Sequence, residues 1–138
     1  MSDIHIDDFY RDSAKILLQL HGCFPRKANV YVEDISGPDT PDEFGLHSDR
    51  HQACFSAILW LAESGYIQYL DTVQQEAVDQ ASLTHKAFTL LASLADGEDP
   101  QQMHCQTNIA RLRDTLKHGS STSLSRLMHQ LLMQSRQH

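Results

Sequence analysis

Apolar residues recur at helical spacing in several stretches of the chain, and each stretch ends near a glycine or begins near a capping residue. The first predicted helix covers about 8–20, and the second begins at Ser48 or Asp49 and ends at Gly65. The third follows the cap Thr84 and runs as far as 95. Two more are predicted after Pro100, one that ends at His118 and one that follows the cap-rich segment 120–123. Asp49 and Gln52 also have the spacing of a capping box. The pattern predicts a mostly helical chain.

Three shorter stretches have the character of strands. Residues 29–35 alternate apolar and polar side chains, which predicts a short, half-buried strand. The stretches 66–73 and 77–83 are also strand-like, and three residues separate them. No Asn-Gly or Asp-Gly marks a hairpin turn there, so it is the order of the elements that predicts an antiparallel ribbon. Before the long central helix, Thr40 and Pro41 suit the start of a short helix over 41–46.

Composition places the chain among ordinary globular proteins. Hydrophobic residues make up 41% and charged residues 21% of its 138 residues, and no apolar run approaches the roughly 20 residues of a membrane span. The first ten residues are acidic and lack the basic and apolar regions of a signal peptide, so we expect a cytoplasmic protein that binds no membrane. The three cysteines are far apart, which favours reduced thiols.

The net charge of −7 is unevenly distributed along the chain. Residues 1–99 carry 6 Lys/Arg against 17 Asp/Glu, whereas residues 100–138 carry 5 Lys/Arg against a single acid. We therefore expect a domain over 1–95 and a helical tail over 100–138, divided at the acidic loop between them.

Residues 65–67 (Gly-Tyr-Ile) close the central helix, a two-stranded ribbon follows, and residues 83–88 (Leu-Thr-His-Lys-Ala-Phe) open the next helix. This order resembles the winged helix-turn-helix superfamily, in particular regulators of the multiple-antibiotic-resistance and phenolic-acid types. It is also similar to small bacterial and prophage winged-helix proteins with a helical tail. The resemblance covers about 8–95 and implies an α+β, mostly helical fold: a winged-helix domain with a two-helix extension. Ala87 stands where these families usually have glycine.

The resemblance implies two possible partners for the central helix. In DNA-binding winged helices this helix enters the major groove, where Arg50, Gln52 and Ser56 would here face the bases. However, the ribbon over 71–79 carries three acids and no base, and duplex affinity comes largely from Lys/Arg on phosphates. We therefore expect a non-enzymatic regulatory or interaction module that contacts protein, with a dimeric DNA-binding transcription regulator as the alternative.

The last predicted helix has a nearly ideal apolar stripe. Its members are Leu124, Leu127, Met128, Leu131 and Leu132. This stripe either covers the domain of its own chain or pairs with a second copy, and we expect a homodimer through the tail. Trp60 lies off the main stripe of the central helix, either as core near the ribbon or as an exposed anchor for a partner.

Metal binding and catalysis find little support in the sequence. His47, His51 and Cys54 could share one helical face, but paired motifs such as CxxC are absent, so we expect no metal and no cofactor. The chain has no glycine-rich phosphate loop, no nucleophile elbow and no HExxH, so we expect no catalytic residues and no enzyme activity.

Overall fold

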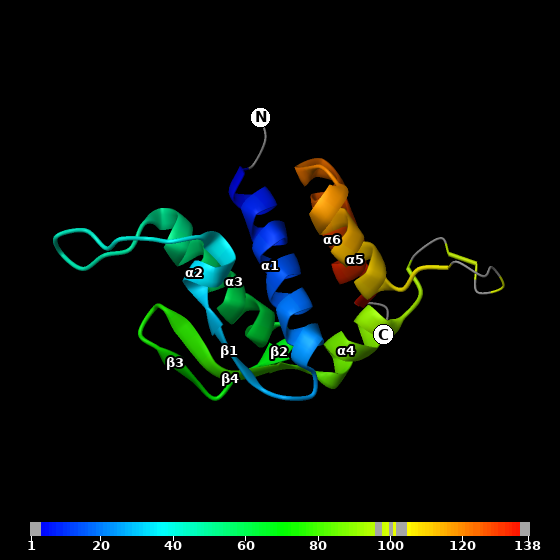
Figure 1. Ribbon diagram of the computed structural model, residues 1–138, viewed down its shortest axis with the longest axis horizontal. Helices are drawn as coiled ribbons and strands as arrows, with labels where there is room; N and C mark the ends of the chain where they lie inside the picture. The colour runs from blue at the N-terminus through cyan, green and yellow to red at the C-terminus, as the bar shows by residue number, and fades with distance from the viewer. Residues whose placement is uncertain (1–3, 96–97, 100, 102–104, 136–138) are drawn as a thin grey trace.

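The computed structural model describes residues 4–95, 98–99, 101 and 105–135 as an α+β fold with a small antiparallel sheet (Figure 1). Its elements are α1 (Ile4–Cys23), β1 (Ala28–Tyr31), α2 (Val32–Ser36), α3 (Asp49–Glu63), β2 (Ile67–Gln68), β3 (Asp71–Val73), β4 (Ala77–Leu83), α4 (His85–Ala92), α5 (Asn108–His118) and α6 (Ser121–Ser135). Helix α1 stands in the middle, with α2 and α3 on one side, α5 and α6 on the other, and the sheet at its base (Figure 1). No described helix is both long and apolar enough to span a bilayer.

Strand β4 is the centre of the sheet. It pairs antiparallel with β1, β2 and β3, and its apolar residues are buried beneath the helices. The expected ribbon is therefore confirmed: β2 and β3 together face β4 across a short turn. The register with β1 shifts between Ala28 and Val30, and Gln80 opposite has φ +52°. There the side-chain oxygen of Asn29 accepts from the Gln80 amide at 3.0 Å, replacing the interrupted ladder bond.

The ends of α3 follow local chemistry. Ser48 is the N-cap, and its hydroxyl accepts from the His51 amide at 3.2 Å. The capping box expected from Asp49 and Gln52 is wrong, because the side-chain Nε2 of Gln52 instead donates to the His47 carbonyl at 2.8 Å. Gly65 ends the helix with φ +84°, a backbone conformation that residues with a Cβ adopt at a cost.

The predictions for 29–46 are partly wrong. The strand stops at Tyr31, and residues 32–36 form α2 in its place, so Val32 and Ile35 reach the core from one helical face. The helix expected over 41–46 is absent, because the Asp42 carboxylate accepts from the amides of Phe44 and Leu46 at 2.8 and 2.9 Å and closes a turn instead. This stretch is part of a long loop, residues 37–48, that projects from the body (Figure 1).

The remaining helices are confirmed, although α1 begins earlier and ends later than the spacing suggested, and α4 ends at Ala92 because Ser93 is already extended. Thr84 caps α4 by accepting from the Ala87 amide at 3.2 Å, and α5 ends at His118 as expected. The buried side chains of α5 and α6 belong to the same apolar cluster as those of α1, α3 and the sheet. The apolar stripe of α6 thus packs within its own chain.

Candidate functional site: the α3 face and its aromatic groove

Arg50 does not lie free on the surface of α3. Its guanidinium donates two hydrogen bonds to the carboxylate of Asp12 on α1, at 2.6 and 2.5 Å, and its Nε is 3.6 Å from Asp8. Asp12 is only 1% exposed, whereas the Arg50 side chain is 34% exposed. The hydrogen bonds that Arg50 donates to Asp12 raise the pKa of Arg50. Arg50 therefore neutralises a buried carboxylate of its own fold.

The other two residues expected to read DNA do not join Arg50 in a basic surface. Gln52 is exposed, but its side-chain amide bonds the His47 carbonyl. Ser56 is exposed and lines an apolar groove, described below. Arg50 is the only Lys or Arg between 49 and 63, and the β3–β4 hairpin over 71–83 contains none. This face consequently lacks the unpaired cations that hold phosphates.

A groove of about 310 Å³ lies between α1 and α3, and its lining is almost wholly apolar. It is lined by His5, Phe9, Asp12, Ala53, Ser56, Ala57 and Trp60. The small side chains of α3 at 53, 56 and 57 leave room beside the aromatic rings. A groove of this kind can accept an apolar side chain of a partner.

Phe9 and Trp60 also line a second pocket of about 370 Å³, so the pair separates two hollows on one side of the molecule. Their rings meet edge to face, with centroids 5.1 Å apart and planes at 88°. Trp60 also stacks loosely on Tyr66 at 6.1 Å, and the Lys86 ammonium lies 4.4 Å from the centre of the Tyr66 ring. Residues of α6, among them His129 and Met133, complete the second pocket.

Trp60 is 39% exposed, so of the two interpretations of its position the exposed one fits better. The sequence indicated that Trp60 could be exposed, because it lies off the apolar stripe of α3. Phe9 gave no such signal, because it fits the apolar face of the first helix. Only the packing of α1 against α3 shows that Phe9 and Trp60 form one surface.

The α6 stripe expected to pair two copies is covered by the rest of the chain. Leu124, Leu127, Met128 and Leu131 are between 0 and 8% exposed, and Leu132 is partly buried against the same core. On the neighbouring surface, the Ser125 hydroxyl donates to Asp7 of α1 at 2.8 Å. These side chains therefore pack within their own chain, which is the first of the two alternatives for the stripe, and the homodimer stays a prediction.

The residues considered for metal binding separate into two groups. His47 and His51 stack on each other, with ring centroids 3.7 Å apart, and both lie near the carboxylate of Asp39. Hydrogen bonds from Ser48 and His47 lower the pKa of Asp39 to about 2. Cys54 lies apart in the core, where burial raises the pKa of its thiol to about 12. Of the three residues considered, only the two histidines lie together, and Asp39 is the third side chain beside them.

Comparisons with protein-family models, with curated proteins and with solved structures find no match.

Proposed function

We propose that the chain is a non-enzymatic interaction module of winged-helix type that binds a protein partner through the groove between α1 and α3. The observation that carries this proposal is the use of Arg50: the only Lys or Arg on α3 neutralises Asp12, while the apolar groove beside it stays open. The element order supports the fold assignment, since a helix, a strand and two helices precede a hairpin.

The chemistry of the groove indicates the kind of partner. The exposed ring of Trp60 and the half-buried ring of Phe9, beside small side chains, suit one aromatic or aliphatic anchor residue. Acidic residues stand within one helical turn of the lining, Asp8 on α1 and Asp49 on α3, in a segment with a strong acidic excess. We therefore propose that the partner presents an apolar side chain flanked by lysine or arginine.

The DNA-binding alternative finds less support. It needs Lys/Arg side chains that can reach phosphates, and the described hairpin and α3 together offer only Arg50. Releasing Arg50 for a base contact would leave Asp12 buried without its partner, at a cost that a single guanine contact of about 1–3 kcal/mol would hardly offset.

Selection from a displayed peptide library tests the proposal. The enriched peptides should carry an apolar anchor with basic flanks. Because Trp60 is the only tryptophan, their binding should change its fluorescence directly. Ala53→Glu, which places a carboxylate in the groove, should weaken binding at least about tenfold, or about 1.4 kcal/mol. Ala92→Glu is the matched control, since Ala92 is also exposed on a helix but lies outside both pockets.

The proposal is wrong if the selected peptides bind Ala53→Glu and Ala92→Glu equally well. It is also wrong if their binding leaves Trp60 fluorescence unchanged, because the groove would then not be the site.

A further inference from the structure

Three side chains that could coordinate a metal meet at the base of the 37–48 loop. Asp39 and His47 come from the two ends of the loop, and His51 comes from the first turn of α3. One ligand atom from each lies within 4.8 Å of the others. Only Asp39 and His47 retain some exposure, 14% and 9% of their side chains, whereas His51 is 1% exposed.

His51 carries a buried nitrogen with no hydrogen-bond partner. Its Nε2 lies 2.8 Å from the Gln75 carbonyl oxygen, which can only accept, so Nε2 holds the proton and donates. In the neutral ring, Nδ1 is then a bare lone pair, and no described group donates to it. It faces the Asp39 carboxylate at 3.9 Å. A buried acceptor opposite a carboxylate is unfavourable unless a proton or a cation lies between them.

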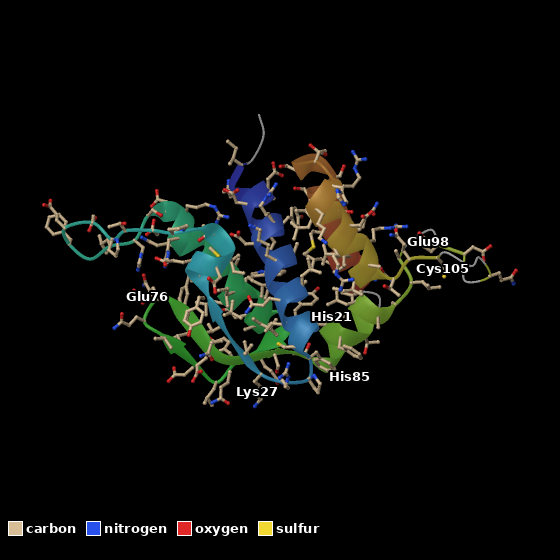
Figure 2. The ribbon with its side chains drawn as sticks, viewed as in Figure 1. His21, Lys27, Glu76, His85, Glu98 and Cys105 are labelled. Atoms are coloured by element: carbon tan, nitrogen blue, oxygen red, sulfur yellow. The ribbon has the colours of Figure 1, made fainter. Side chains whose placement is uncertain are left out.

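His47 also lies between Asp39 and the hairpin turn, but its Nδ1 is hydrogen-bonded to Asp39. Its Nδ1 is 2.9 Å from Oδ2 of Asp39, and its Nε2 is 3.7 Å from Oε1 of Glu76. Figure 2 shows Glu76 at the turn between β3 and β4, on the side of the molecule from which the 37–48 loop projects. Each histidine therefore has one nitrogen directed at Asp39 and the other at an acceptor of residues 75–76.

We propose that Asp39, His47 and His51 form a binding site for a divalent transition-metal ion, coordinated by Oδ2 of Asp39 and by Nδ1 of each histidine. Two imidazoles and a carboxylate suit Zn²⁺, with water at the remaining position. The Gln75 carbonyl and the Glu76 carboxylate then accept from the outer N–H of the two rings, the usual arrangement around metal-bound histidine.

Binding requires both rings to turn from their stacked arrangement. They are stacked 9° from parallel, and each must turn so that its Nδ1 lone pair points at the ion. Two of the three ligands lie at the ends of a loop whose tip is exposed, Phe44 at 80% and Leu46 at 59%. The ion would join both ends of this loop to α3 and hold it against the hairpin.

Titration of the full, untagged chain with Co²⁺ tests the site, because this ion suits Zn²⁺ ligands and reports its geometry by visible absorption. We expect one equivalent to bind with ligand-field bands of low-coordinate Co²⁺ and without a thiolate charge-transfer band, and added Zn²⁺ should displace it. His47→Gln should abolish the bands, and Glu76→Gln should weaken binding about tenfold by removing the outer acceptor.

His85→Gln is the matched control, because His85 is exposed on α4 and lies far from Glu76 (Figure 2). It should bind Co²⁺ as the unchanged protein does. If the circular dichroism of His47→Gln shows misfolding, Asp39→Asn takes its place. The inference is overturned if Co²⁺ shows no saturable binding, or if His47→Gln or its replacement Asp39→Asn binds Co²⁺ as the unchanged protein does. It is also overturned if a thiolate band shows that a cysteine is the ligand.

Discussion

Replacing Arg50 by methionine removes the charge that neutralises Asp12 while keeping a long apolar side chain. Asp12 is 1% exposed, and no other described Lys or Arg forms an ion pair with it. Leaving one member of a buried pair uncompensated costs roughly 3–5 kcal/mol. Because the Arg50 side chain is 34% exposed, water can replace part of the interaction that Asp12 loses in this variant. We therefore expect the free energy of unfolding to fall by about 3 kcal/mol, near the lower end of that range.

The reverse change should cost less, because the two partners differ in burial. Asp12→Asn keeps the shape of the side chain and leaves Arg50 with solvent and with Asp8 at 3.6 Å. We expect a loss of about 1.5–2 kcal/mol for this variant, near the lower end of the ~1.5–3 kcal/mol that a hydrogen bond to a charged group contributes.

Urea denaturation measures both variants, with Arg26→Met as control because Arg26 is exposed in the α1–β1 connection. With a slope of about 2 kcal/mol per molar urea, Arg50→Met should lower the midpoint by about 1.5 M. The control should stay within about 0.5 kcal/mol of the unchanged protein. If Arg50→Met is no more destabilising than Arg26→Met, Arg50 does not serve the buried carboxylate as we argue.

Three further predictions concern the core. Cys54, with its thiol pKa of about 12, should resist alkylation of the folded protein at about pH 8, whereas the partly exposed Cys23 should react; peptide mass mapping after a timed pulse separates them. Leu131→Ala should cost about 3 kcal/mol, because Leu131 is 1% exposed, while the exposed neighbour Gln130→Ala should cost under about 0.5; thermal or urea unfolding checks the difference. Asn108→Ala should cost about 1–3 kcal/mol in the same assay, since its buried amide bonds a main-chain carbonyl of α4 at 2.8 Å.

Helices with strong periodicity and clear caps could be predicted from the sequence. Thr84 caps α4 as expected, Gly65 ends α3, and the ribbon after it pairs as the order of elements indicated. These features depend on interactions within a few residues, so the local pattern contains most of the information.

The segment before α3 could not be predicted, because its structure depends on distant contacts. Val30 and Val32 fit a strand by alternation, whereas Val32 and Ile35 fit one face of a short helix, and burial of both against the core favours the helix. The turn at 42–46 depends on the Asp42 side chain, which competes with helix formation. A pattern-based prediction weighs neither effect.

The candidate site shows the same limit. Arg50 looked available to a ligand because nothing in its own helix pairs with it, and its partner Asp12 lies 38 positions earlier. Phe9 and Trp60 likewise come together only when α1 packs on α3. Side chains that meet across helices leave no spacing signature in one sequence, so the groove could be found only in the folded structure.

Binding of a fluorescent mixed-sequence duplex, followed by anisotropy at about 50 mM salt where phosphate contacts are strong, tests most directly whether α3 lacks a usable cation. Our prediction is no saturable binding by the unchanged protein and none by Arg50→Ala. Saturable binding that weakens steeply with salt and disappears in Arg50→Ala would contradict it.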